Sequence, residues 1–426
     1  MPARRLLALL TAALVAALLS AAAPATAEQP RLEARAWALI DARSGEVLAS
    51  HAAGRRLPVA STTKLMTAYL ALAELPLRKI VRAAPYDAFY GESLLGLGAG
   101  ERVSVRDLLY GLILQSGNDA AHAVAVAVAG SERRFVRRMN RRARALGLAD
   151  TRYANPIGLD DPGAYSSALD LTALARRLLR DPAFAKIADS PGAVLRSLRP
   201  PRRIGTRNDL LLRESWVTGV KTGHTLGAGY VLVGSGRRKG AELITAVLGA
   251  PSTAARDGES LRLLDHGFSM YRKRTPVRAG EAPASPSIAF SGGELPLRAA
   301  RTLVVGVRRG QRLRVAVRAP GEVEGPIRRG AALGRAIVFV DGLRAASTPL
   351  RAGRAVPVAS ALDRARSFVA GHPIFIGLGL FSAILLGVAI LRRRRRPATE
   401  GEETIRESRE QRRAERQRRR EEGTVR

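Results

Sequence analysis

The spacing of apolar positions along residues 28–271 switches between two periods, which predicts strands at both ends of this region and helices between them. The stretch 34–50 is typical of two strands around a Ser44-Gly45 turn. Leu65 and Leu72 follow at helical spacing, and their helix is expected to end before Pro76. The last stretch, 227–250, predicts a hairpin of two long strands around SGRRKG.

Four further stretches between these ends have helical patterns, namely 104–114, 118–130, 132–147 and 170–181. The first begins with Ser104 and Asp107, which resemble a capping box. The second is built from small residues and is expected to be deeply buried. The third places Phe135, Met139 and Leu146 on an arginine-rich surface. The simplest packing puts the first and last strands on one antiparallel sheet flanked by helices, a mixed α/β (α+β) fold.

Residues 1–27 have the layout of a secretory signal peptide, with two arginines, an apolar run over 6–19 and small residues after it. Ala25 and Ala27 stand where cleavage is expected. The alternative is an uncleaved membrane anchor at this end.

The region after residue 271 has a different pattern. Short β-rich runs between Gly and Pro predict a small β-rich domain over 275–355, and a linker is expected over 356–372. An uncharged apolar run then covers 373–391, about as long as the ~30 Å hydrocarbon core of a bilayer is thick, and five arginines follow it. This pattern predicts a single transmembrane helix in the cell membrane, a body outside it and a basic cytoplasmic tail over 392–426.

Charge and composition narrow the possible partners. The 426 residues carry a formal net charge of +33 and no cysteine, so disulfides, thiolate catalysis and cysteine-zinc sites are excluded. The excess of arginine indicates either a compositional bias or attraction to polyanions such as lipid head groups, anionic wall polymers or nucleic acid. Because the body is expected outside the membrane, nucleic acid is not expected as a partner.

One lysine stands out in a chain whose positive charge comes almost wholly from arginine. Lys64 follows Ser61 by three residues, which places both side chains on one face of a helix. A serine hydroxyl needs a base before it can attack, and arginine cannot serve because its pKa lies above about 12. A lysine can serve if burial or a second cation lowers its pKa to roughly 7–8. Alone, this S-x-x-K pattern is common by chance.

Two later stretches strengthen the pattern. The S-G-N stretch at 116–118 is expected in a break between two helices, where a hydroxyl and an amide can relay a proton and orient a peptide; a plain turn with a helix cap is the alternative. The K-T-G stretch at 221–223 is expected at the opening of a strand. Lys221 there is a like charge that would depress the pKa of Lys64, and Gly223 would let a substrate backbone approach the strand edge.

The motifs S-x-x-K, S-x-N and K-T-G, in this order, are the set found in penicillin-binding proteins and class A β-lactamases. Longer stretches of the chain resemble the low-molecular-weight penicillin-binding proteins, which are serine-type D-Ala-D-Ala carboxypeptidases; these stretches are 59–69, 112–148, 158–179 and 220–234, with 316–334 similar to their small C-terminal domain. The resemblance covers about residues 28–360. It implies a β-lactamase/transpeptidase-like peptidase domain over 28–271, followed by the small β-rich domain.

The resemblance implies three catalytic residues. Ser61 would attack the carbonyl of the D-Ala-D-Ala bond and form an acyl-enzyme, with Lys64 as the activating base. Ser116 would pass a proton to the leaving D-Ala, and the backbone N–H groups of Ser61 and His224 would form the oxyanion hole. No cofactor and no metal are implied.

A second set of residues would bind the substrate, a peptidoglycan stem peptide. Asn118 would hold the acyl side chain, and Lys221 and Thr222 would bind and polarise the scissile group, beside Gly223. Arg207 matches a position that helps to hold the terminal carboxylate, a group that a guanidinium suits. β-Lactam antibiotics would act as covalent inhibitors at the same site.

The predicted function is therefore a serine-type D-alanyl-D-alanine carboxypeptidase. A D,D-endopeptidase that cleaves cross-links shares every catalytic residue and stays open, as does a non-catalytic wall-binding scaffold of another class. A β-lactamase fits less well, because no glutamate lies between Glu132 and Glu214, and Asp160 and Asp161 are one methylene too short to replace it. β-Lactams are therefore expected to stay attached to Ser61.

Overall fold

The computed structural model describes residues 29–371, 373–394 and 401–421, so the predicted signal peptide lies outside the described residues. The chain forms two compact units. Of the described residues, the first unit contains those up to 281 together with 299–318 and 335–348, and the second contains 282–298, 319–334 and those from 349 onward. All three sequence motifs lie in the first unit.

The bounds of the described elements are as follows. The helical segments are the 3-10 turn η1 (Ala60–Thr63), α2 (Lys64–Glu74), α3 (Val105–Tyr110), the π-helical turn η2 (Gly111–Gln115), α4 (Asn118–Ala129), α5 (Glu132–Ala145), α6 (Ala168–Leu178), α7 (Pro182–Ala188), α8 (Asp209–Arg213), α9 (Thr253–Ser269), α10 (Ala361–Gly371), α11 (Pro373–Arg394) and α12 (Gly401–Glu421). The strands are β1 (Ala36–Asp41), β2 (Val47–His51), β3 (Ile80–Arg82), β4 (Arg102–Ser104), β5 (Gly192–Leu195), β6 (Arg202–Gly205), β7 (Val217–Thr225), β8 (Gly229–Arg238), β9 (Ala241–Ala250), β10 (Tyr271–Val277), β11 (Ser287–Ile288), β12 (Gly293–Glu294), β13 (Leu297–Ala299), β14 (Leu303–Arg308), β15 (Leu313–Arg318), β16 (Glu322–Val323), β17 (Ala332–Val340) and β18 (Leu343–Ala352).

The central sheet of the first unit has the strand order β2-β1-β9-β8-β7, and every neighbouring pair is antiparallel. The first strand therefore lies beside one from the end of the region, with Ala38 opposite Ala246, which confirms the predicted sharing of one sheet. The predicted hairpin is β8–β9. Strand β7, which carries the K-T-G motif, is the edge strand of this sheet, so one of its sides has no neighbouring strand.

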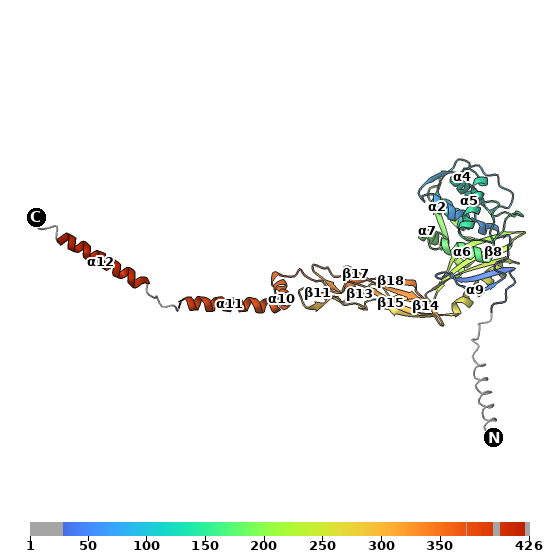
Figure 1. Cartoon of the computed structure of the whole chain (residues 1–426). Coiled ribbons are helices and arrows are strands. Elements are labelled where there is room, and N and C mark those ends of the chain that lie inside the picture. Colours follow the sequence, from blue (N-terminus) through green and yellow to red (C-terminus); the bar gives the residue numbers. More distant parts are fainter. Residues whose placement is uncertain (1–28, 372, 395–400, 422–426) are drawn as a thin grey trace, which may run out of the picture. The chain divides into compact units, whose positions relative to one another are not determined.

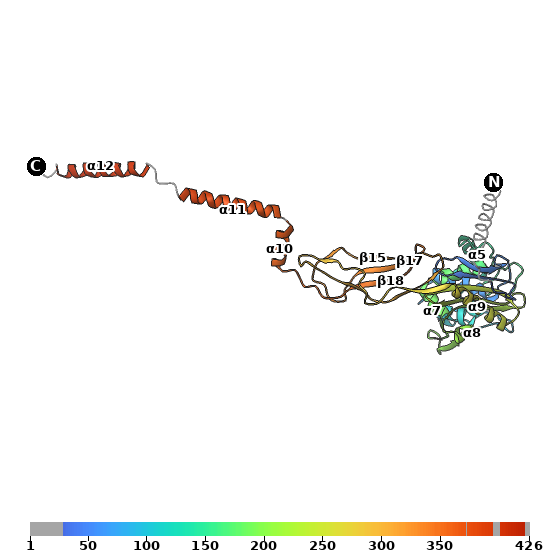
Figure 2. The same ribbon diagram turned by 90° about the horizontal axis from the view of Figure 1, so that it is seen from below.

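Helices cover both faces of this sheet. Successive residues of β1 point to opposite sides, so Ala38 and Ile40 enter a core shared with α2 to α6, whereas Trp37 and Leu39 enter a core shared with α9. Because both faces are buried, β1 is a continuous apolar run rather than an alternating one. Figure 1 shows α2, α4 and α5 on one side of the sheet and α9 on the other, and Figure 2 gives the view from below.

The helices follow the sequence patterns except near the motifs. Ser104 caps α3 by accepting the N–H of Asp107, as its spacing predicted, and Phe135 and Met139 are fully buried on α5. The predicted helix over 104–114, however, changes to a π-helical turn at Gly111, a rare winding that is found mostly at functional sites. Apolar spacing does not distinguish α-helical from π-helical winding over five residues, so it could not predict this change.

The C-terminal region contains only strands between Tyr271 and Ala352, as its pattern predicted. In the first unit β10 pairs with β14, and in the second unit β11 pairs with β12 and β16. The predicted linker contains α10, and part of the predicted tail forms α12. Within the residues that the structure describes, no helix combines the length and the apolar character needed to cross a membrane. The predicted transmembrane helix falls on α11 and is not supported by the structure.

The close approach of α9 to the sheet depends on a glycine. A Cβ atom at Gly267 would lie 2.5 Å from Cδ1 of Leu243 and 2.9 Å from Cδ2 of Leu39, so Gly267→Ala should destabilise the fold by about 1–3 kcal/mol through overpacking. The matched control is Gly258→Ala in the same helix, where the atom nearest to the new Cβ is the flexible end of Arg262 at 3.6 Å. Because alanine has a higher helix propensity than glycine, this substitution should leave the stability unchanged or raise it. The thermal midpoint should fall in Gly267→Ala and should stay unchanged or rise in Gly258→Ala; equal midpoints in the two variants would contradict this packing.

Candidate active site

The S-x-x-K pair is brought into direct contact where the chain enters α2. The Nζ of Lys64 donates to the Oγ of Ser61 at 2.9 Å and to the carbonyl oxygen of Ile157 at 2.6 Å. The sequence predicted one helix for both residues, but Ser61 lies in the 3-10 turn η1 and α2 begins at Lys64. The turn begins at Ala60, whose φ of 49° is a left-handed value that a residue with a Cβ rarely adopts. This geometry directs the serine to the surface and the lysine inward.

Lys64 has the electrostatic properties that a base needs. Its side chain is 0% exposed, and burial lowers its pKa to about 7, with the positive charge of Arg207 acting in the same direction. The carboxylates of Glu92 and Asp119 oppose this effect and raise the pKa. Near neutral pH a large share of the Lys64 amine is therefore unprotonated and able to accept a proton from Ser61.

A segment that sequence reasoning missed, residues 155–160, holds Lys64 in place. Ile157 supplies the carbonyl that Lys64 binds, and the side chain of Asn155 fixes this turn by accepting the N–H of Gly158 at 2.6 Å. Gly158 has a φ of +88°, and a Cβ atom there would lie 2.0 Å from the carbonyl oxygen of Ala60, so only glycine fits against the serine turn. The N-P-I-G sequence is a turn signal, but nothing in it indicates the distant lysine.

The S-G-N stretch lies in a break between helices, as predicted. Ser116 follows η2 in a left-handed conformation with φ 61°, and Asn118 is the first residue of α4. Both are buried. A left-handed non-glycine residue persists only where the surrounding structure holds it, and such residues gather at active sites.

The K-T-G stretch lies in the middle of β7, not at the opening of a strand as the sequence predicted. Lys221 is 1% exposed and donates to the carbonyl oxygen of Thr222 at 2.8 Å. Burial lowers its pKa well below the usual value, and the charge of Lys64 adds to this effect. A Cβ atom at Gly223 would lie 3.0 Å from the backbone nitrogen of Ser61, so β7 passes directly beside the serine turn. His224 is exposed and stacks on Tyr230.

Arg207 lies near these groups, because its charge lowers the pKa of both buried lysines. The Nη1 of its side chain donates to the Oγ of Ser93 at 2.7 Å, and its backbone N–H donates to the carbonyl oxygen of Leu114. The guanidinium is exposed, which leaves it accessible to an anionic group entering from solvent.

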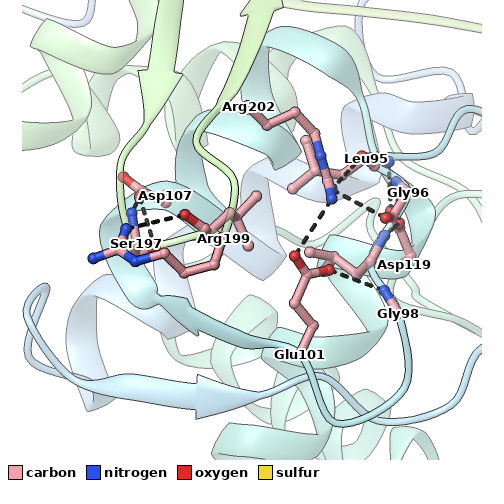
Figure 3. Close-up of polar contacts among 11 residues, drawn as sticks. Leu95, Gly96, Gly98, Glu101, Asp107, Asp119, Ser197, Arg199 and Arg202 are labelled. Carbon is pink, nitrogen blue, oxygen red and sulfur yellow. Dashed lines mark hydrogen bonds and ion pairs between the residues drawn. The ribbon is translucent and has the colours of Figure 1, made fainter.

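The loop of residues 86–97, which the sequence did not indicate as part of the site, forms one wall of it. The carboxylate of Asp119 accepts the N–H groups of Leu95, Gly96 and Leu97 at 2.7–2.8 Å. Arg202 donates to the carbonyls of Leu95 and Gly96 from the other side and contacts Glu101 (Figure 3). The base of this loop is therefore held firmly next to the S-G-N stretch.

A cavity of about 570 Å³ opens in front of the serine. Its walls are the loop of residues 86–97, the segment 155–160 and the turn after β7, and the predicted site residues among its lining are Ser61, Asn118 and His224. Lys64 and Lys221 lie buried behind the lining. A larger cavity of about 690 Å³ is lined largely by arginines and contains none of the predicted site residues, so the chemistry belongs to the smaller one.

The segment 155–160 also closes the far wall of this cavity. The carboxylate of Asp160 accepts the hydroxyl of Thr225 at 2.6 Å and the N–H of Gly227 at 3.0 Å. Asp160 therefore joins this segment to the turn after β7. This engagement gives it a structural role.

Comparison with known proteins gives a consistent result. The model of the peptidase S11 family, described as D-alanyl-D-alanine carboxypeptidase, matches residues 23–252. The D-alanyl-D-alanine carboxypeptidase DacC of Escherichia coli is 38% identical over 304 residues, which cover 68% of this chain and 75% of the relative. DacF of Bacillus subtilis is 31% identical, over 75% of this chain and 85% of the relative.

A solved structure is similar over the same region. The crystal structure of penicillin-binding protein 5 from Haemophilus influenzae superposes with a TM-score of 0.55 at 29% identity, covering 78% of this chain and 99% of that protein. Both the sequence match and the fold therefore extend beyond the three motifs to the peptidase region as a whole. The chain belongs to the peptidase S11 family of serine-type D-alanyl-D-alanine carboxypeptidases.

Proposed function

We propose that this chain removes the terminal D-Ala from peptidoglycan stem peptides through an acyl-enzyme on Ser61. The observation that carries the proposal is the buried Lys64 amine, whose Nζ lies 2.9 Å from the Oγ of Ser61 and whose pKa is lowered to about 7. A neutral amine at hydrogen-bond distance from a hydroxyl is the arrangement that general-base activation of a serine needs.

The residues suggest a sequence of steps. Lys64 takes the hydroxyl proton of Ser61 while the Oγ of Ser61 bonds to the carbonyl carbon of the penultimate D-Ala. The resulting oxyanion is held by the backbone N–H groups of Ser61 and His224. The carbon–nitrogen bond then breaks, and a proton delivered through Ser116 leaves with the amine of the terminal D-Ala. Water attacks the remaining ester, releases the shortened peptide and restores the serine.

The positive charges around the cavity favour a substrate that ends in a carboxylate. The positive charge of Arg207 lowers the pKa of both Lys64 and Lys221, and the charge of Lys64 lowers the pKa of Lys221, so the three cations lie near one another. A terminal D-Ala carboxylate would be attracted to this field, and Arg207 would pair with it. Asn118 and Thr222 would align the peptide along the open edge of β7. The same groups would receive a β-lactam, which would acylate Ser61.

We further propose that the chain is exported and is anchored in the cell membrane by residues 373–391, with the peptidase unit outside and the basic tail inside. The support lies in the sequence, where an uncharged apolar run is followed at once by five arginines. Such an anchor would keep the enzyme next to the wall on which it acts.

The first test is release of D-Ala from a peptide that ends in D-Ala-D-Ala, using the purified full chain. Ser61→Ala should abolish release and covalent labelling by penicillin, because no other hydroxyl lies at the Lys64 amine among the described hydrogen bonds. Ser190→Ala, a serine outside the cavity, is the control and should keep full activity. Labelling of Ser61 without D-Ala release would favour cross-link cleavage, and absence of both would favour the scaffold.

The second test is the pH dependence of Ser61 acylation by a labelled penicillin. Lys64 is active only when neutral, so the rate constant should rise with pH and reach half of its maximum near pH 7. Lys64→Arg keeps the charge but cannot lose its proton, and should lower the rate by about 10²–10⁴-fold at every pH. A rate that is flat between pH 5 and pH 9 would rule out Lys64 as the base.

The third test concerns the anchor. In cells, the full chain should remain in the membrane pellet after washing with high salt and alkaline carbonate, because burial of the apolar run does not depend on salt. A variant that ends at residue 371 should be released. If the full chain is released by salt alone, the attachment is electrostatic and the spanning proposal is wrong.

A further inference from the structure

Glu92, in the loop of residues 86–97, forms a hydrogen bond with the side-chain amide of Asn118, which is predicted to bind the substrate. Its Oε2 accepts the side-chain N–H of Asn118 at 2.6 Å and the hydroxyl of Tyr86 at 2.5 Å. Its Oε1 accepts the backbone N–H of Phe89 at 3.1 Å. Both oxygens of the carboxylate are therefore engaged, and one of them is bonded to the residue that would hold the acyl side chain.

The backbone on both sides of this contact is also fixed. The N–H of Asn118 donates to the carbonyl oxygen of Ser93 at 2.7 Å, so the same loop holds both the main chain and the side chain of the asparagine. Asp119 and Arg202 in turn clamp the base of the loop (Figure 3). Glu92 is thus held against Asn118 by a connected set of hydrogen bonds.

A carboxylate is a selective partner for an amide. An ionised carboxylate only accepts hydrogen bonds, so the NH₂ end of Asn118 must face Glu92 and its oxygen must face elsewhere. Burial raises the pKa of Glu92, but the hydrogen bonds from Asn118 and Tyr86 together with the N–H of Phe89 and the charge of Lys64 lower it further than burial raises it. Glu92 is therefore ionised at neutral pH and keeps the amide in one orientation.

Glu92 also lies close enough to the Lys64 amine for its charge to change the pKa of that amine. It lines the same cavity as Ser61, and its negative charge raises the pKa of Lys64 against the effects of burial and of Arg207. Asp119 is the other carboxylate whose charge raises the pKa of Lys64, and Arg207 is the cation whose charge lowers it. Glu92 is thus one of two acidic groups in this balance.

From these contacts we propose that Glu92 is a positioning residue of the peptidase reaction, which fixes the orientation of the Asn118 amide and places a negative charge in the wall of the cavity that Ser61 also lines. The proposal rests on the roles proposed above for Asn118 and Lys64. It assigns to a residue outside the three motifs a part in binding and in the pH range of the enzyme.

Two substitutions separate the effect of the hydrogen bond to Asn118 from the effect of the negative charge. Glu92→Gln removes the charge but keeps an acceptor, whereas Glu92→Ala removes both. Because Glu92→Ala removes a hydrogen bond to a charged group, it should lower kcat/KM for the D-Ala-D-Ala peptide by about 10–100-fold. Glu92→Gln should lower it less. In both variants the acid limb of Ser61 acylation should move to lower pH, because Lys64 loses a neighbouring negative charge.

The matched control is Glu101→Gln, which removes the same charge from the loop that leads into β4. Glu101 bonds to the N–H of Gly98 and to Arg202, and it does not line the cavity (Figure 3). Its replacement should leave the midpoint of the acid limb unchanged. Tyr86→Phe removes one donor to Glu92 but leaves the charge, so it also should leave the midpoint in place.

The measurements are penicillin acylation of Ser61 between pH 5 and pH 9 and kcat/KM for the peptide, on the full chain. A downward shift in both Glu92 variants but not in Glu101→Gln supports the proposal. It is overturned if the midpoints coincide with that of the unmodified enzyme, or if Glu101→Gln shifts the midpoint equally, which would indicate general loosening of the loop.

The outcome also separates this proposal from the proposed function. If the unmodified chain takes up penicillin on Ser61 but releases no D-Ala, the choice of substrate is wrong while the acylation profiles still decide the role of Glu92. If Ser61→Ala takes up penicillin as well as the unmodified chain does, the serine mechanism fails and the role of Glu92 fails with it.

Discussion

The exclusion of water from the amine of Lys64 is the constraint on which the site depends. An exposed lysine is almost fully protonated at neutral pH and cannot act as a base, whereas a buried one loses hydration that favours its charged form. The fold achieves this by starting α2 at Lys64, inside the core, and by placing the serine one turn earlier in η1. The amine then has two acceptors, the Oγ of Ser61 and the carbonyl oxygen of Ile157, so it is buried without being left unsatisfied.

Several separate parts of the chain are required by this one arrangement. The segment 155–160 provides the carbonyl, and Gly158 allows it to approach the serine turn. Strand β7 provides the opposite side, where Gly223 allows equally close contact with the backbone of Ser61. The central sheet holds β7 at its edge, so one side of this strand has no neighbouring strand in the sheet. The helices on both faces of the sheet bury it between two hydrophobic cores.

Two lysines are buried near each other, which disfavours the charged form of both, and nearby carboxylates partly offset this effect for Lys64. Lys64 and Lys221 each have a lowered pKa, and Arg207 adds a third cation nearby. The carboxylates of Glu92 and Asp119 act in the opposite direction. Asp119 also binds the base of the loop of residues 86–97, and Glu92 binds Asn118. The acidic groups therefore have both an electrostatic and a geometric effect on the same few atoms.

Apolar spacing was enough to predict the elements with strong periodicity and the antiparallel sheet with its covering helices. The three motifs, in their order, were specific enough to predict the family and its chemistry. The 3-10 turn at Ser61, the π-helical winding before Ser116 and the presence of Glu92 and Ile157 at the site became visible only in the folded chain. Periodicity indicates which side of a segment is buried, whereas these features depend on contacts between residues far apart in the chain, such as Lys64 and Ile157, which are 93 positions apart.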